Sequence, residues 1–480
     1  MRIDMKKMFK YLPILFSLFL FACSSDKAET EKREQILYTV MPKREYHLVS
    51  NHYQETDRAL ITQLWEGLTE LKEGGVRLIE VTDIQHSKDF LEWKFYLRED
   101  LTWSNGEPIT AESYRKSWLE SLKNSPMLQE KYRMFVIQNA EKFSENKVSE
   151  EEVGIKAEKN VLQVQLHTPI SNFDEWVSNP IFYPLHPDNE RLKAGEKIVN
   201  AAFRVASMQE DKIILEKNES YWDAVNTRLK KVEISLVENE IMAYEMFPRY
   251  EIDFFGTPFY SIPFERLKQA NTLPEKLIFP VMKYCYISIP NETKDPFLET
   301  SNRKLRELLY AVSDPEFMGK VIVQNDSPAI FSHPHPSSEL ISKSKEEFEA
   351  LQQQKHFTFS DSPYVARFHS DKLLEKKLLL STVKEWISSF KFPIRVTSDE
   401  KAKATFQMEH YLLGSNRKED FYYYISKKYG VNITKEEEFL KELPVIPLLQ
   451  ENTTLLLHSE VRGLNVAPNG DIYLKYIIIQ

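Results

Sequence analysis

Two histidines in a proline-rich stretch are the first residues whose types and spacing suggest chemistry. His333 and His335 alternate with Pro334 and Pro336, and two imidazoles at this spacing can chelate a transition metal ion. The prolines, however, favour an extended exposed loop, and no third ligand is marked nearby. We therefore expect a plain loop here, with no metal site and no other cofactor.

Motifs of catalysis and of phosphate binding do not occur in the sequence. His-Glu-x-x-His, Gly-x-Ser-x-Gly, Gly-x-x-x-x-Gly-Lys-Ser/Thr and Gly-x-Gly-x-x-Gly are all absent, and so is an EF-hand loop. Glycine accounts for only 12 of the 480 residues, whereas it makes up roughly 7% of average proteins. The net charge of −9 argues against a general nucleic-acid binder. The sequence therefore predicts a protein that is not an enzyme and does not bind nucleic acid.

Cys23 stands at the end of a short apolar run near the N-terminus. Basic residues precede the apolar stretch 11–22, which is too short for a membrane span because a span needs about 20 residues. This pattern is typical of a secretory signal. Residues 20–23, Leu-Phe-Ala-Cys, resemble a bacterial lipobox, which implies that Cys23 is lipidated after removal of residues 1–22. The alternative is an ordinary signal end with a chance cysteine.

The second cysteine, Cys285, has no partner for a disulfide if Cys23 carries lipid. We expect it to be a small buried apolar residue. Residues 23–35 are polar, and they are predicted to form a tether between the membrane and the folded protein.

The elements that must position any site alternate between strands and helices. Residues 91–97 alternate apolar and polar side chains, which predicts a half-buried strand. Thr110 is the expected N-cap of a following helix. Further strands are expected at 162–166, 212–217 and 232–236, and a long helix over 373–390 that ends before Pro393. The pattern predicts an α/β protein in which both kinds of element are mixed.

Four segments resemble a known family in the same order along the chain. Residues Trp93–Trp118 resemble, nearly position for position, the signature of the family 5 extracellular solute-binding proteins, which are the oligopeptide-binding proteins of ABC importers. Leu64–Leu68, Glu216–Asp223 and Tyr250–Asp253 are similar to further segments of that family. Weaker similarity continues toward the C-terminus, so the resemblance covers most of the mature chain.

The resemblance implies a two-lobed periplasmic-binding-protein clamp with an additional helper domain. Lobe I is expected to be discontinuous, lobe II to be the helper domain, and ligand to bind between lobes I and III, which close by a hinge. The predicted boundaries are 36–63, 169–262 and 443–480 for lobe I, 64–168 for lobe II, and 263–442 for lobe III.

The resemblance also implies that an extended peptide is held like an added strand, with side chains in roomy pockets. The family's ligand-facing segments map onto Tyr53, Glu55, Met127, Tyr284, Cys285, Ser288, Glu409, His410, Tyr411, Leu412 and Gly414. Each of these has a plainer alternative, because Tyr284 and Tyr286, for instance, alternate like the face of a packed strand.

One departure from the family concerns the amino end of a bound peptide. Relatives carry an aspartate just after the strand that corresponds to 406–414, and it pairs with the peptide's α-amino group. Leu412, Leu413 and Gly414 stand at these positions here. Glu409 or Asp420 is the nearest substitute, since a buried charge must have a partner. The stretch from Gly414 to Pro444 is also shorter than in relatives.

The resulting hypothesis is a lipid-anchored binding protein of a peptide ABC importer in the cell envelope, outside the cytoplasmic membrane. Its expected partners are an oligopeptide or related small solute, permease subunits and the membrane, and the protein is expected to be a monomer. Two alternatives stay open: a binding protein for a cell-wall peptide or metal chelate, and a surface-interaction lipoprotein that does not transport.

Overall fold

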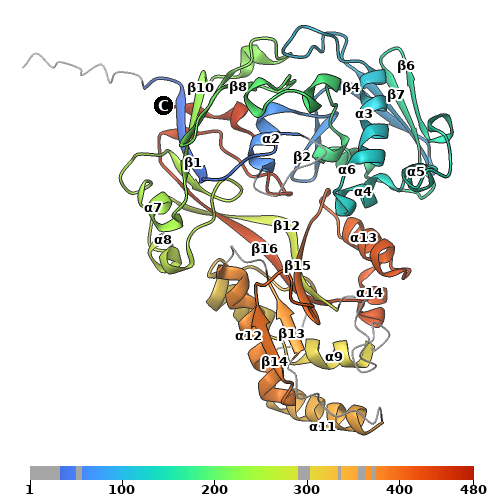
Figure 1. The fold of residues 1–480 in the computed structure, drawn as a ribbon, viewed down its shortest axis with the longest axis vertical. Helices are drawn as coiled ribbons and strands as arrows, with labels where there is room; N and C mark the ends of the chain where they lie inside the picture. Colours follow the sequence, from blue (N-terminus) through green and yellow to red (C-terminus); the bar gives the residue numbers. More distant parts are fainter. Residues whose placement is uncertain (1–32, 50–56, 290–302, 333–336, 355–363, 369–372) are drawn as a thin grey trace, which may run out of the picture.

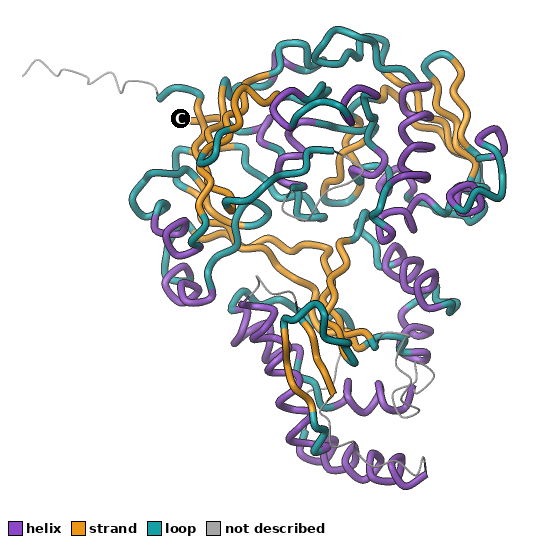
Figure 2. The backbone as a smooth tube through the Cα atoms, viewed as in Figure 1, coloured by secondary structure: helices purple, strands orange, loops and turns teal. Residues whose placement is uncertain are grey.

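A computed structural model of the chain describes residues 33–49, 57–289, 303–332, 337–354, 364–368 and 373–480. These residues form two bodies joined by a pair of long strands (Figures 1 and 2). We call the part built on two four-stranded sheets the large body, and the part built on a six-stranded sheet the small body.

The large body contains two separate four-stranded sheets over one continuous apolar core. The first sheet has the order β1 (Ile36–Pro42), β10 (Lys231–Val237), β9 (Lys212–Lys217) and β8 (Phe203–Met208), and β1 runs parallel to β10. The second has the order β4 (Val81–His86), β5 (Glu92–Leu97), β7 (Val161–Gln165) and β6 (Ile155–Glu158). A two-stranded sheet of β2 (Thr69–Lys72) and β3 (Gly75–Leu78) completes this body.

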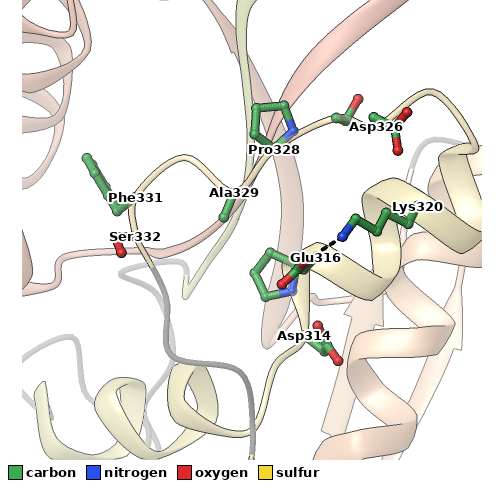
Figure 3. A pocket seen from close by; sticks show the side chains of 10 residues that line it. Asp314, Glu316, Lys320, Asp326, Pro328, Ala329, Phe331 and Ser332 are labelled. Carbon is green, nitrogen blue, oxygen red and sulfur yellow. Dashed lines mark hydrogen bonds and ion pairs between the residues drawn. The ribbon is translucent and has the colours of Figure 1, made fainter.

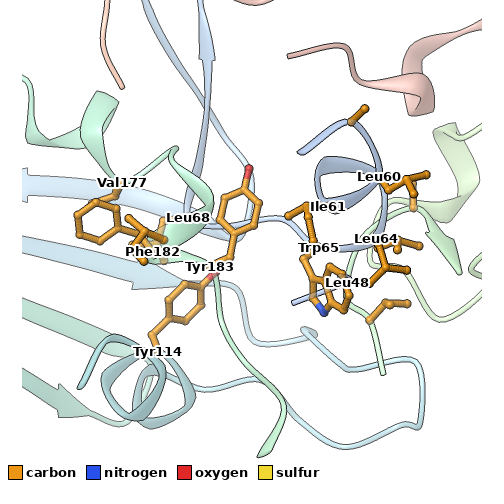
Figure 4. Packing of buried hydrophobic residues seen from close by; sticks show 14 of the residues in the cluster. Leu48, Leu60, Ile61, Leu64, Trp65, Leu68, Tyr114, Val177, Phe182 and Tyr183 are labelled. Atoms are coloured by element: carbon orange, nitrogen blue, oxygen red, sulfur yellow. The ribbon is translucent and has the colours of Figure 1, made fainter. Parts of the chain in front are cut away.

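Short helices surround these sheets. Those within residues 58–176 contribute to the shared core, whereas those within 240–270 pack into a separate apolar cluster. α2 (Arg58–Leu64) is buried along its whole length, and Figure 4 shows its side chains packed near those of segment 177–183. The other helices are α3 (Ala111–Asn124), α4 (Leu128–Met134), α5 (Ala140–Ser144), α6 (Phe173–Trp176), α7 (Glu240–Glu245) and α8 (Leu267–Ala270).

Local sequence explains the strand and helix that the resemblance centres on. In β5, Trp93, Phe95 and Leu97 are buried while Glu92 and Lys94 are exposed, because side chains of a strand alternate between its two faces. α3 begins in a capping box, in which the Thr110 hydroxyl accepts from the Ser113 amide and the Ser113 hydroxyl accepts from the Thr110 amide. The predicted strand and the predicted N-cap of the following helix are therefore confirmed.

The small body is a sheet covered by helices on both faces. Its strand order is β11 (Phe254–Gly256), β16 (Ile446–Leu457), β12 (Lys276–Ser288), β15 (Phe406–Leu412), β13 (Tyr364–Arg367) and β14 (Ile394–Thr397). α9 (Arg303–Ala311), α11 (Ser338–Gln354) and α12 (Leu373–Phe390) share one apolar core with the sheet. α13 (Glu419–Tyr429) and α14 (Glu436–Glu442) share a second core with it, and the short α10 (Pro315–Phe317) completes the body.

The long strands β12 and β16 connect the two bodies (Figure 1). Their antiparallel pairing changes register between Pro280 and Tyr284, where two residue steps on β16 oppose four on β12. The predicted strand at 212–217 and the predicted helix at 373–390 are confirmed in full. The predicted lobe boundaries stay a prediction, although β16 already belongs to the small body's sheet at Ile446.

The C-terminal segment returns to the large body after β16. β17 (Val461–Arg462) pairs with β18 (Ile478–Ile479), and Ile477 and Ile479 are fully buried in the large core. Gln63 of α2 donates to the Ile472 carbonyl over 2.7 Å. The last residues of the chain thus complete a body whose first strand is β1.

Candidate functional site

The two bodies meet along a polar and aromatic contact that we call the seam. On the large body it comprises Gln129, Glu130, Tyr132, Arg133, Glu141, Ser171, Glu175 and Trp176, and on the small body Leu412, Gly414, Asn416, Arg417, Asp420, Tyr423, Tyr424 and Lys427. Figure 1 shows α4 of the large body next to α13 of the small body. The seam is formed by elements far apart in sequence.

Arg133 lies at the centre of the seam, and its side chain is only 1% exposed. It extends from α4, and its guanidinium donates to the Glu130 carboxylate and to the Leu412 carbonyl of β15. Its Nε lies 3.5 Å from Oδ2 of Asp420, and its Cζ lies 4.8 Å from the ring centroid of Tyr411. Arg133 therefore joins α4 to both β15 and α13.

Asp420 is the small-body partner of Arg133, and it has no free oxygen. Its Oδ1 accepts from the Tyr411 hydroxyl over 2.7 Å. Its Oδ2 accepts from the Gly414 amide and pairs with Arg133. A buried carboxylate needs such partners, since an unpaired buried charge costs several kcal/mol by general estimates.

The two carboxylates around Arg133 keep it charged. Burial lowers the pKa of the guanidinium, but the negative charges of Asp420 and Glu130 outweigh burial and hold the pKa above its ordinary value. Burial also raises the pKa of the Tyr411 phenol, and the neighbouring Asp420 charge raises it further. The centre of the seam is thus an ion pair that is closed to solvent.

Gly414 allows the backbone to approach this ion pair. A Cβ atom at this position would lie 2.9 Å from Nε of Arg133 and 3.4 Å from Oδ2 of Asp420. The side chain of Arg133 is held by two carboxylates, at Nε by Asp420 and at Nη1 by Glu130, so a Cβ at 2.9 Å from Nε would not fit without displacing Arg133. Glycine at 414 is therefore required by the seam.

The aromatic side of the seam has unused hydrogen-bond donors. The rings of Trp176 and Tyr423 lie 5.6 Å apart, and those of Tyr132 and Tyr424 lie 5.9 Å apart. Within the described part of the chain, the buried Nε1 of Trp176 and the buried hydroxyl of Tyr423 have no hydrogen-bond partner. Buried donors of this kind are available to a ligand.

Backbone contacts complete the seam. The Asn416 amide donates to Oε2 of Glu175 over 2.7 Å, and Gln129 donates to the His410 carbonyl over 3.4 Å. At the rim, Nζ of Lys427 lies 2.9 Å from the Glu141 carboxylate. These contacts hold β15, the loop 413–418 and α13 against the large body.

Only some of the predicted site residues belong to the seam. Leu412 contributes its carbonyl and Gly414 its amide. Met127 is half-buried at the start of α4 and packs against the large core. Tyr53, Glu55 and Cys23 lie outside the described residues.

The side chains of the other predicted residues pack within the small body, because helices cover both faces of its sheet, and among them the Tyr411 ring also lies beside Arg133 of the seam. Tyr284 and Tyr411 are fully buried in the core under α13, whereas Cys285 is fully buried in the opposite core. The burial expected for Cys285 is thus confirmed. Contact of Tyr284, Tyr411 and Cys285 with a ligand stays a prediction. It would require the covering helices to move away from the sheet.

Glu409, Ser288 and His410 take part in polar contacts inside the small body. Glu409 accepts from the Ser288 hydroxyl over 2.5 Å and from the Tyr286 hydroxyl over 3.0 Å, and it pairs with Lys428. His410 lies on the other face of β15.

The ring nitrogens of His410 are 2.5 Å from Glu451 and 3.0 Å from Glu375. Burial by itself lowers the pKa of His410, but these two carboxylates raise it to about 9. The side chains of Glu409, Ser288 and His410 are therefore already engaged in contacts within the protein before any ligand binds.

Sequence reasoning did not find Arg133, Glu175, Trp176 or Tyr423. The one local signal was the spacing of Glu130 and Arg133, because a glutamate three residues before an arginine forms a pair on one helix face. Asp420 was proposed for a ligand's amino group, whereas here it is paired with a side chain of the protein itself.

A separate pocket of 370 Å³ lies in the small body, and acidic residues line part of it (Figure 3). Its carboxylates have local roles: Glu316 pairs with Lys320 over 2.5 Å, and Asp314 accepts from the Phe317 amide at the start of α10. In the residues that the structure describes, no group of three His, Cys, Asp or Glu side chains is placed to hold a metal ion. None of the described helices has both the length and the apolar character of a membrane span.

The fold and the seam define a class of protein: two bodies are joined by a strand pair and share an interface of mixed polar and aromatic character. The sequence profile of the bacterial extracellular solute-binding proteins, family 5 Middle, matches residues 62–368, which is more than half of the chain. The chain therefore belongs to this family.

Individual relatives agree with this assignment. The oligopeptide-binding protein OppA of Bacillus subtilis is 28% identical over 289 residues, covering 57% of this chain and 52% of that protein. The chain thus spans about half the length of the curated relatives that it matches.

Two solved structures have the same fold at low sequence identity. Listeria monocytogenes OppA bound to peptide superposes with a TM-score of 0.75 at 18% identity, covering 93% of this chain and 99% of that one. Haemophilus influenzae OppA in complex with RPPGFSPFR gives 0.77 at 17% identity, covering 93% and 99%.

Proposed function

We propose that the protein is the binding component of an ABC importer and captures peptides between its two bodies. The observation that carries the proposal is the seam, in which polar and aromatic groups from both bodies meet beside a two-strand hinge. Membership of the family and the likeness to peptide-bound proteins support the same function.

In the proposed mechanism the ligand lies between the bodies in an open form and is enclosed when they close. Main-chain groups of an extended peptide supply hydrogen bonds that do not depend on its side chains, so specificity for sequence is low. The unpartnered donors of Trp176 and Tyr423 are suited to peptide carbonyls. The closed form would then be the one that permease subunits recognise, with the binding protein acting as a monomer.

The proposed location is outside the cytoplasmic membrane, with the chain anchored through a lipid on Cys23. Replacing Cys23 by serine should release the protein from the membrane fraction, because two acyl chains give stable anchoring. Immunoblots of membrane and soluble fractions measure this. Equal membrane retention of Cys23→Ser and the unchanged protein would count against the anchor.

The peptide function is tested by ligand-dependent stability. A pool of tetrapeptides at 100 times its average Kd should stabilise the folded protein by about 2.7 kcal/mol, because a ligand that binds only the native state shifts unfolding by mass action. Thermal melts with the pool, with ferric chelates and with buffer alone make the comparison. Mass spectrometry of the freshly purified protein identifies any bound solute. A melt that shifts with chelates and not with peptides would refute the proposal.

A further inference from the structure

Every acidic side chain identified at the centre of the seam already has a donor from the protein. Glu130 pairs with Arg133. Oε2 of Glu175 accepts from the Asn416 amide over 2.7 Å and from Asn172 over 3.4 Å. Both oxygens of Asp420 are occupied, as described above. Among these residues a ligand's ammonium group therefore finds no carboxylate that lacks a hydrogen-bond donor, and the carboxylates of Glu130 and Asp420 already face the cation Arg133.

The Arg133–Asp420 pair joins the two bodies rather than stabilising one of them. Arg133 belongs to α4 of the large body and Asp420 to α13 of the small body, and each side chain is only 1% exposed. Separation of the bodies would hydrate both charges, and closure without Arg133 would bury Asp420 with no cation opposite it. Burial of an unpaired carboxylate is strongly unfavourable.

The surroundings of the guanidinium are shaped for it. Tyr411 lies under its plane, with the ring centroid 4.8 Å from Cζ, and the Leu412 carbonyl accepts one of its hydrogens. Gly414 leaves the space that Nε occupies, since a Cβ would come within 2.9 Å of it. Together with Asp420, four separate groups of the small body thus fit one side chain of the large body.

We propose that Arg133 is a built-in counter-charge for Asp420, so that the seam closes without any ammonium group from a ligand. The ligand consequence rests on the proposed function: peptides with blocked amino termini bind as well as peptides with free ones. Arg133 then determines the chemical class of ligand, because it occupies the position in which a cationic ligand group would gain a partner.

The first experiment compares two versions of one tetrapeptide pool, with free and with acetylated amino termini, by isothermal titration calorimetry. In the unchanged protein the two pools should have Kd values within about twofold of each other. In Arg133→Met the free-amine pool should gain about tenfold over the acetylated pool, because its ammonium replaces the missing guanidinium beside Asp420. In Arg133→Met/Asp420→Asn the difference should shrink, because the Asp420 charge is gone and only the Glu130 carboxylate of α4 remains beside the vacated position.

Matched variants separate this effect from general damage. Arg115→Met makes the same substitution in the same body, at an arginine paired with Glu112 and Glu150 away from the seam. It should leave the ratio of the two pools unchanged. Arg133→Lys keeps a cation and should also behave as the unchanged protein does. A tenfold preference of the unchanged protein for free amines, or no gain in Arg133→Met, would overturn the proposal.

A second experiment needs no ligand and so distinguishes the inference from the peptide function. Small-angle X-ray scattering of the ligand-free protein should show a larger radius of gyration for Arg133→Met than for the unchanged protein and for Arg115→Met. The double variant Arg133→Met/Asp420→Asn should be compact again. If Arg133→Met does not fold, Asp420→Asn alone, which leaves Arg133 paired with Glu130, should open the protein partially.

The two experiments fail in different ways. If neither pool binds any variant while the scattering follows the expected order, the peptide function fails and the counter-charge stands. If the radius of gyration is the same for Arg133→Met, for Asp420→Asn and for the unchanged protein, Arg133 does not control closure and the inference fails, whatever the peptides do.

Discussion

At the scale of single residues, Glu80 is the buried acid with the clearest consequence for stability. It is fully buried and accepts from the Tyr114 hydroxyl over 2.5 Å and from Asn200 over 2.8 Å. Burial and the nearby Glu66 charge raise its pKa to about 8. Because the unfolded chain ionises Glu80 from about pH 4.5 upward, the folded state loses relative stability as pH rises from there to about 8.

Glu80→Gln should therefore stabilise the protein in alkaline solution. The amide is neutral at all pH values, and it can still accept from Asn200 while donating to the Tyr114 hydroxyl. The gain in free energy of unfolding should grow by on the order of 3 kcal/mol between pH 5 and pH 8. Urea denaturation at both pH values measures it, with Glu92→Gln on the exposed face of β5 as control. A gain of equal size at pH 5 would contradict this reasoning.

Gly414→Ala should destabilise the closed protein by about 2 kcal/mol, because the new methyl group forces Arg133 from its place. The cost should fall in the Arg133→Met background, where the guanidinium is gone. A double-mutant cycle by urea denaturation measures this coupling. Gly195→Ala is the matched control, since a Cβ there would meet nothing nearer than 3.9 Å. If the effects of Gly414→Ala and Arg133→Met on the free energy of unfolding are additive, the new methyl group does not act through Arg133.

The residue scale also marks the limit of sequence reasoning. Gly414 and Leu412 were predicted because a resemblance placed them after a strand. Arg133 was not predicted, because its partner Asp420 is 287 positions away and nothing local announces the pair. Whether two elements far apart in sequence form an ion pair depends on the tertiary fold. A single sequence does not show which elements the fold brings together.

At the scale of elements, the capping box of α3 is a local feature that the sequence displays in part. Thr110 was predicted as the N-cap, and the reciprocal bond from Ser113 was not. Thr110→Ala should lower the free energy of unfolding by about 1 kcal/mol, because the Ser113 amide in the first turn loses its acceptor. Thr110→Ser should retain most of the stability. Chemical denaturation measures both, and equal losses in the two variants would contradict the capping role.

The strand β12 shows why periodicity alone could not place the predicted site. Its alternating residues were compatible with a face toward a ligand or with a packed face. In the structure both faces are packed, with Tyr284 under α13 and Cys285 in the core under α12. The second helical layer comes from residues more than a hundred positions later, so its position could not be read from the strand.

At the scale of the whole molecule, the rim of the seam allows closure to be adjusted without touching the central pair. Glu141 and Lys427 come from opposite bodies and are partly exposed. Glu141→Lys and Lys427→Glu should each favour the open form a few-fold, because exposed pairs are worth at most about 1 kcal/mol. The double swap should restore closure. Scattering at low salt measures this, and an open double variant would exclude a direct pair.

The two-body architecture was predicted from the family resemblance, and it matches the fold observed. The mutual placement of the bodies was not, because it depends on β12, β16 and the contacts of the seam. A single continuous core also lies under both sheets of the large body, which the predicted division into lobes I and II did not anticipate.

The return of the C-terminal segment has a consequence for how the protein is made. Arg58 near the start of the chain pairs with Asp471 over 2.6 Å, and Lys475 pairs with Glu66 over 2.9 Å. These buried partners leave the ribosome more than four hundred residues apart. The large body cannot finish folding until Asp471 and Lys475 have been synthesised, so contacts of high sequence separation delay it.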